Sequence, residues 1–402
     1  MAGLLLVGAL VCVVALVVTL LVGEDSYEVT VPDSLGRDVD AAGAGSTLLA
    51  LEQGLRERDV DAVTALAPSD DDEAQDLLSA VATNAEQLRV EDLSLRYVGE
   101  AGPVRADGSW EAFVDLTWAF AGFDQRPART EVVVTLRPDG GRVAIESFGG
   151  EGRNPLWLTG PLSVVRSDTS LVLAAGSEAD AERWATRVRR GIPVVLRVLP
   201  QWRPRVVLEV PDSGAGVDEA LGAQPGTYAA IAGVTASADG TLGPDAPVHV
   251  YANPEVTARL RQRGAQVVIS HELVHVATDA VSGVVPPWLL EGFADYVALR
   301  DVPLPLERTA SRAAELARRD GLPTRLPGPE ELDTRAEDLE AVYEQAWLVC
   351  RVLAQEAGEG ALVATYRAVD AGTPVGAALR RHAGLTEREL VELWRAEIED
   401  LL

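Results

Sequence analysis

Two histidines and a glutamate within one short segment form the most reactive pattern in this sequence. His271 and His275 lie four residues apart, and Glu272 lies between them. On a helix this spacing puts both imidazoles on one face, one turn apart, and so offers two nitrogen ligands to a Zn²⁺ ion. Glu272 then lies close enough to act as a base toward water at that ion. Because the whole chain has only four histidines, we interpret the pattern as a metal site.

The flanking residues predict a buried helix for this motif. Residues 266–279 contain no glycine or proline, and many neighbours of the motif are valine, leucine or isoleucine. A helix that is apolar on most sides is buried, and its polar side chains then need partners. A metal ion is such a partner for the two imidazoles. The alternative is a pair of core histidines bonded to backbone carbonyls, which leaves Glu272 buried and unpaired.

Glu291 is our candidate for a third ligand. Asp279 continues the same helix face, but it lies two turns from His271, too far along the axis for both to bind one ion. A third histidine ten residues after His271 is excluded, because that position is Val281. Glu291 follows a loop and a Pro-Pro pair, which suits the start of a second helix. Asp295, one turn later, can accept a hydrogen bond from a ligating histidine and fix its tautomer; the alternative is a solvated helix carboxylate.

The wider pattern resembles the gluzincin branch of the zincin metallopeptidases. His-Glu-x-x-His is followed at residues 288–296 by Trp-Leu-Leu-Glu-Gly-Phe-Ala-Asp-Tyr, a form similar to that of peptidase MA-like domains. The resemblance implies that His271, His275 and Glu291 are zinc ligands and that Glu272 is the general base. Three protein ligands leave a fourth position for water, which distinguishes a catalytic zinc from a structural one.

A second, shorter resemblance lies downstream at residues 341–349. It is similar to the aminopeptidase segment in which a tyrosine followed by Glu-Lys-Gly heads a helix and stabilises the oxyanion, which implies this role for Tyr343. Here Gln345 and Ala346 replace the Lys-Gly pair, and the alternative is that Tyr343 is an ordinary residue of an amphipathic helix. Residues 232–237 match the amine-binding loop of zinc aminopeptidases but contain no acid. Strict aminopeptidase activity is therefore disfavoured.

The other two histidines and Cys350 receive no catalytic role. His249 lies in an alternating segment that predicts a strand just before the zinc helix. In zincins this position is the edge strand that pairs with an extended substrate, and His249 could equally be a cross-strand surface residue. His382 is expected at the exposed end of a helix. Cys350 is expected to be a small core residue, and no structural disulfide is expected.

Together these residues predict a zinc-dependent peptidase. Glu272 would take a proton from the activated water and later deliver it to the leaving amine, so that a peptide bond of a peptide or protein substrate is hydrolysed. The alternative is a zinc-binding but catalytically inactive anchored scaffold, although a binding protein has no need of a general base. The net charge of −27 argues against a nucleic-acid partner.

The N-terminus predicts a membrane anchor. Residues 2–23 are apolar and uncharged, long enough to cross a hydrocarbon core of about 30 Å, and no Ala-x-Ala-like cleavage site follows. We therefore expect residues 1–23 to form a transmembrane helix. The chain is then a single-pass protein of the cell membrane with its catalytic domain on the extracytoplasmic side. Residues 24–45 are acidic and contain Gly, Pro and Asp, which indicates a linker.

The rest of the chain predicts an α+β fold in two domains. Residues 46–150 resemble the nuclear-transport-factor-two-like fold, a cone-shaped unit of helices and a curved sheet, because helical patterns precede a run of strands. Residues 155–402 are expected to form the zincin metallopeptidase domain, with a mixed sheet beside the zinc helix and a helical C-terminal lobe. The first domain should contain helices at 47–58 and 74–89 and strands at 93–98, 110–120, 130–136 and 142–148. The second should open with strands at 162–175, 205–210 and 227–234 and a helix at 179–190.

Overall fold

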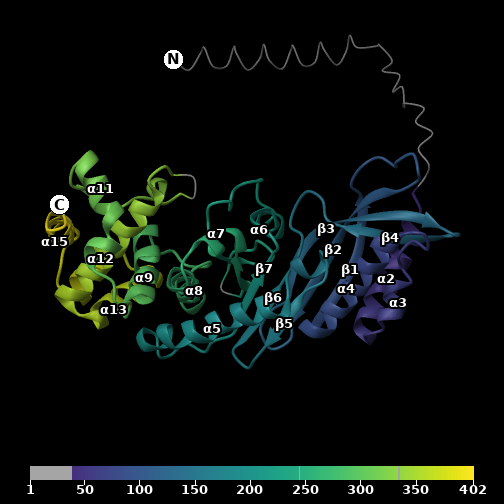
Figure 1. Ribbon diagram of the computed structural model, residues 1–402, viewed down its shortest axis with the longest axis horizontal. Coiled ribbons are helices and arrows are strands. Elements are labelled where there is room, and N and C mark those ends of the chain that lie inside the picture. The colour runs from purple at the N-terminus through teal and green to yellow at the C-terminus, as the bar shows by residue number, and fades with distance from the viewer. Residues whose placement is uncertain (1–38, 244, 334–335) are drawn as a thin grey trace, which may run out of the picture. The chain divides into compact units, whose positions relative to one another are not determined.

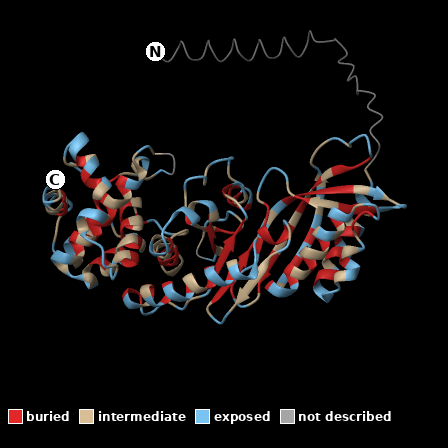
Figure 2. Ribbon diagram, viewed as in Figure 1, coloured by how far each residue is buried: buried red, intermediate tan, exposed pale blue. Residues whose placement is uncertain are grey.

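The computed structural model describes residues 39–243, 245–333 and 336–402, which form helices and two separate sheets (Figure 1). Asp40–Leu402 make up one compact unit. The fold of the described residues is mixed α/β. Buried residues lie along the strands and on the inward faces of the helices (Figure 2).

The structure contradicts two predictions, the transmembrane helix and the membrane location that was based on it. Among the described residues, no helix is both long enough and apolar enough to span a membrane. The longest described helix, α5 (Glu178–Val198), carries exposed charged residues instead of the run of about 20 apolar residues that a span needs. Residues 1–23, where the anchor is predicted, lie outside the described residues, as does most of the predicted linker.

The first half of the compact unit is a layer of helices on an antiparallel sheet. Each of the three helices begins at an aspartate, Asp40, Asp59 or Asp71, whose carboxylate accepts a hydrogen bond from a backbone N–H of the first turn. The strands pair in chain order, and alternate side chains of the second strand are buried. The elements are α2 (Ala41–Glu57), α3 (Val60–Thr64), α4 (Asp72–Leu88), β1 (Val90–Glu100), β2 (Trp110–Phe120), β3 (Ala128–Asp139) and β4 (Arg142–Phe148).

This half has the predicted order of helices followed by strands, with two differences. The first helix begins inside the predicted linker, because the Asp40 carboxylate accepts a hydrogen bond from Gly43 N at 2.7 Å and so starts the helix earlier. The short helix α3 was not predicted. Five residues are too few to show a helical period in the sequence.

The second sheet is mixed, with strand order β5-β6-β7-β9-β8. β6, β7 and β9 are parallel, and the outer strands β5 and β8 are antiparallel to their neighbours. The elements of this part are η1 (Leu156–Leu158), β5 (Ser163–Arg166), β6 (Ser170–Ala174), α5, β7 (Val206–Val210), α6 (Gly214–Leu221), β8 (Gly233–Ser237) and β9 (Val248–Ala252).

Three predictions about this sheet are wrong. The segment 162–175 is a hairpin of β5 and β6, because Ser167 hydrogen-bonds its own backbone neighbours and turns the chain. The strand predicted at 227–234 begins only at Gly233. The strand that carries His249, β9, is not the sheet edge, because β8 pairs with its outer side. Strand β8 is therefore the free edge next to α8 (Gln262–Ala277), the helix that carries His271 and His275.

The C-terminal part, which follows the second sheet, is helical, as predicted. Helix α9 contacts both α8 and α12, and Gly292 lets it approach α12 closely: a Cβ at this position would lie 2.2 Å from the carbonyl oxygen of Ala346. Cys350 is buried in this core, as expected. The elements are α7 (Pro254–Arg259), α8 (Gln262–Ala277), α9 (Pro287–Leu299), α10 (Leu306–Thr309), α11 (Ser311–Asp320), η2 (Pro329–Leu332), α12 (Leu339–Ala357), α13 (Glu359–Asp370), α14 (Val375–His382) and α15 (Glu387–Glu399).

His249 joins the two sheets. Its ring is fully buried, with Nδ1 2.6 Å from Glu209 Oε1 on β7 and Nε2 3.0 Å from Asp124 Oδ1, just after β2. Burial opposes the charged imidazolium, but the Asp124 and Glu209 carboxylates outweigh this effect and raise the pKa of His249 to about 10. His249 is thus a buried cation between two carboxylates, not the surface residue that the alternating pattern allowed.

We predict that His249→Gln lowers the free energy of unfolding by about 3–5 kcal/mol at pH 7, because it leaves two buried carboxylates without a countercharge. The stabilisation from His249 is complete below its ordinary pKa of 6.5 and is lost as the pH rises toward 10. Urea denaturation from pH 6 to pH 10 should therefore show falling stability in the wild type and a flatter profile in the variant. His382→Gln, at the end of α14, is the control, and the same loss in both variants would contradict the assignment.

Candidate metal centre

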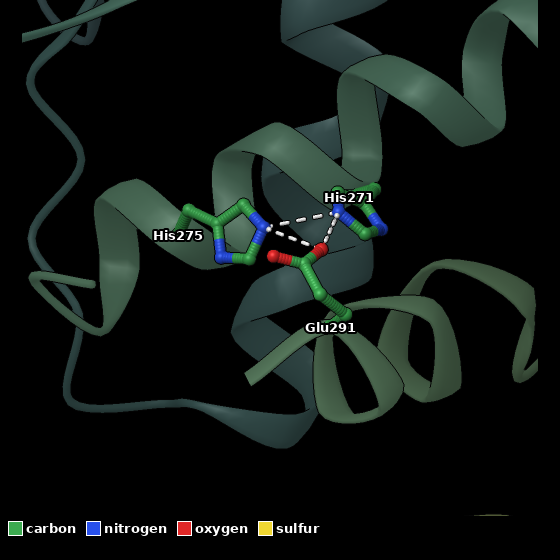
Figure 3. A group of neighbouring side chains, drawn as sticks. All are labelled: His271, His275 and Glu291. Carbon is green, nitrogen blue, oxygen red and sulfur yellow. Dashed lines mark hydrogen bonds and ion pairs between the residues drawn. The ribbon is translucent and has the colours of Figure 1, made fainter. Parts of the chain in front are cut away.

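The three predicted ligands converge on one point (Figure 3). His271 Nε2 lies 3.0 Å from His275 Nε2 and 3.1 Å from Glu291 Oε2, and His275 Nε2 lies 3.4 Å from the same oxygen. Among the described residues, this is the one group of three or more His, Cys, Asp or Glu side chains whose ligand atoms lie within 4.8 Å of one another.

Two buried helices hold these side chains in place. Helix α8 packs against α5, α9 and the strands β8 and β9, which leaves its two imidazoles on the side toward α9. Pro286 caps α9 and Pro287 takes its first position, where a missing N–H costs nothing, so Glu291 comes one turn into that helix. Asp279 lies beyond the end of α8 with a positive φ of 51° and takes no part in the group.

The donor set fits a Zn²⁺ ion. Ligands at about 2.0–2.1 Å from a tetrahedral zinc lie roughly 3.3–3.4 Å apart, close to the three separations between 3.0 and 3.4 Å seen here. Burial opposes the charge of Glu291, but His275 and His271 outweigh it and hold the pKa of this carboxyl well below its usual range. Glu291 is therefore ionised and can act as an anionic ligand at neutral pH.

Asp295 orients one of the histidines. Its Oδ1 lies 2.8 Å from His271 Nδ1, so the Nδ1–H of His271 donates to this carboxylate and Nε2 is left to face the group. Asp295 comes one turn after Glu291 on α9, the position expected from the sequence. His275 differs, because its buried Nδ1 has no hydrogen-bond partner among the described residues.

Glu272 and Tyr343 line a cavity beside the metal group. The cavity has a volume of about 950 Å³ and also reaches His271 and Gly233. The Tyr343 ring meets the His271 ring edge-on, with centroids 6.3 Å apart. Burial, and next the carboxylates of Glu291, Glu272 and Asp295, raise the pKa of the Tyr343 hydroxyl far above its usual value, so this hydroxyl stays protonated and can donate a hydrogen bond.

Thr235 is a residue of this site that the sequence did not indicate. Its Oγ1 donates to Glu272 Oε2 at 2.7 Å, although 37 positions separate the two residues. A threonine in a strand carries no sign of such a contact, because the order of strands in the sheet decides it. His249 lies in the separate cluster with Asp124 and Glu209, and His382 ends α14; neither belongs to the metal group.

A comparison with models of known protein families finds no match for this chain, and a comparison with curated proteins finds none either. The resemblance to gluzincin metallopeptidases, and that of the first domain to the nuclear-transport-factor-two-like fold, therefore stay predictions. Any function proposed for this chain therefore has to be argued from the geometry of the site.

We predict that the purified protein binds close to one Zn²⁺ per chain and that His275→Ala loses it, because two of three ligands hold zinc far more weakly than three. Inductively coupled plasma mass spectrometry after exhaustive dialysis measures the ratio. His382→Ala removes a histidine outside the group and should keep its zinc. Equal zinc in both variants would place the metal elsewhere, and its absence from a folded wild type would refute the site.

Proposed function

We propose that this chain is a zinc-dependent peptidase. The observation that carries the proposal is the convergence of His271, His275 and Glu291 beside a cavity that Glu272 also lines. A structural zinc site is closed by four protein ligands, whereas a catalytic site has three and keeps one position for water or substrate. The group here has three members among the described residues, and one of them, His271, borders the cavity.

A zinc ion held by these three residues would supply Lewis acidity, which lowers the pKa of water toward about 7 and polarises a carbonyl group. Glu272 has the position of the general base, because it follows His271 directly and lines the same cavity. Its carboxylate accepts the proton of the attacking water and later delivers that proton to the leaving amine. It is only 5% exposed, so bulk water competes little for this proton.

Tyr343 is suited to donate a hydrogen bond to the developing oxyanion. Its hydroxyl stays neutral at physiological pH, because burial and three nearby carboxylates raise its pKa. Tyr343 lines the cavity, and a hydrogen-bond donor that is already in place needs little rearrangement when negative charge develops. Asp295 takes no part in the proton transfers; it holds the ring of His271 in one orientation.

Strand β8 supports a peptide as the substrate. Ala232 O accepts a hydrogen bond from Asn253 N, and Ala238 N donates to Pro247 O, both toward β9. Backbone groups of successive residues in a strand point in opposite directions, so those of Gly233 and Thr235 point toward the free edge. An extended peptide can pair there by strand addition, next to Glu272.

We predict that Glu272→Gln keeps its zinc and loses hydrolysis of fluorescein-labelled casein by about 10²–10⁴-fold, because a glutamine cannot take up the proton. Release of labelled peptides measures the activity, and metal analysis confirms the loaded site. Glu356→Gln, an exposed change on α12, is the matched control and should retain full activity.

The same assay separates the peptidase from the scaffold alternative. Turnover by Glu272→Gln at the wild-type rate would refute the role of Glu272. A zinc-loaded wild type that leaves casein and a mixed peptide library intact would favour a metal-binding protein without catalysis.

We also predict that Tyr343→Phe lowers kcat by about 10²–10³-fold with little change in KM, because it removes an oxyanion donor that acts mainly in the transition state. Steady-state kinetics on the same substrate separate the two constants. Tyr296→Phe removes a hydroxyl that bonds Glu359 instead and serves as the control. An unchanged kcat in Tyr343→Phe would make Tyr343 an ordinary helix residue.

A further inference from the structure

We propose that Thr235 is a positioning residue for Glu272 and that it links this carboxylate to the edge strand β8; the inference rests on the proposed peptidase function. Thr235 is half-buried in the middle of β8, and its side chain points toward α8. Strand β8 would then both bind the peptide substrate and, through Thr235, hold the base Glu272 that acts on that peptide.

The contact between Thr235 and Glu272 is short and well defined. Thr235 Oγ1 lies 2.7 Å from Glu272 Oε2 and 3.2 Å from the backbone oxygen of Glu272. A hydroxyl has one proton to donate, and the shorter distance is typical of a bond to a charged oxygen. No other side chain among the described residues donates a hydrogen bond to this carboxylate. The hydroxyl therefore fixes Oε2 and leaves Oε1 free to receive a proton.

Gly233 restricts the same carboxylate from a second position. A Cβ on Gly233 would lie 3.1 Å from Glu272 Cγ and 3.2 Å from Oε1, closer than ordinary van der Waals contact. Gly233 and Thr235 are two residues apart in one strand, so both face α8. Gly233 leaves just enough room for the Glu272 side chain, and Thr235 holds that side chain by a hydrogen bond. Strand β8 thus sets where the carboxylate points.

The same two residues turn their backbone groups to the free edge of the sheet. A peptide that pairs with Gly233 and Thr235 satisfies these groups and fixes the strand. Because Thr235 also holds Glu272, ordering of the strand also orders the base. Such an effect belongs to the chemical step more than to binding, so it should appear in kcat rather than in KM.

The test compares three variants of the zinc-loaded full chain. Thr235→Val keeps the side-chain shape but loses the donor, and we expect kcat for labelled casein to fall by about 10–100-fold, as for loss of a hydrogen bond to a charged group. Thr235→Ser keeps the hydroxyl and should restore most of kcat. Thr257→Val is the matched control, because Thr257 is buried and donates to Ala232 O at 3.3 Å without touching Glu272. An equal loss in Thr257→Val, or no rescue by serine, would overturn the proposal.

Crystal structures of the wild type and of Thr235→Val give a readout that does not depend on turnover. We expect the Glu272 carboxylate to rotate away from its wild-type position in the valine variant and to keep that position in Thr235→Ser. Thr235→Ala, which removes the hydroxyl without a new methyl contact, replaces the valine variant if that one does not fold. If the wild type cleaves no casein, the peptidase proposal fails, and an unmoved Glu272 in these crystals would independently refute the role of Thr235.

Discussion

Two imidazoles and a carboxylate face one another within 3.4 Å between two largely apolar helices, and the rest of the site depends on this contact. Polar groups taken out of water need partners of matching charge. Asp295 supplies one on the outer side of His271, while the inner nitrogens and the Glu291 oxygen point at one another. A divalent cation satisfies all three at once. Burial makes the group costly without a partner, and its three ligand atoms lie close enough together that they could hold a metal ion.

The scaffold places Glu272, Tyr343 and the edge strand β8 around that centre. Helix α8 contributes both histidines and Glu272. The close approach of α9 to α12 at Gly292 fixes Glu291 on α9. It also brings Tyr343 of α12 to the cavity that Glu272 lines. Strand β8 lies outside β9 and reaches Glu272 through Thr235. The buried cation His249 on β9 ties this sheet to the first one, so both sheets contribute to the position of the edge strand.

The sequence could predict contacts between residues close together in the chain, but not contacts between residues far apart. The spacing of His271 and His275 is a property of one helix, and Glu291 lies one short loop away, so local patterns are enough to single them out. The alternation in β2 likewise marks its bounds. The edge position of β8 and the contact of Thr235 depend on strand order, which local patterns do not encode. The burial of His249 depends on Asp124, a partner 125 positions away, and the alternating pattern around His249 is the same for a surface strand.

The most direct test of the metal centre is the X-ray absorption spectrum at the zinc edge of the purified, zinc-loaded chain. Four light atoms at about 2.0–2.1 Å, with the multiple scattering of two imidazoles, are the predicted result for two histidines, one carboxylate and one exchangeable position. Scattering from sulfur at about 2.3 Å, or a zinc environment without imidazole, would contradict the centre formed by His271, His275 and Glu291.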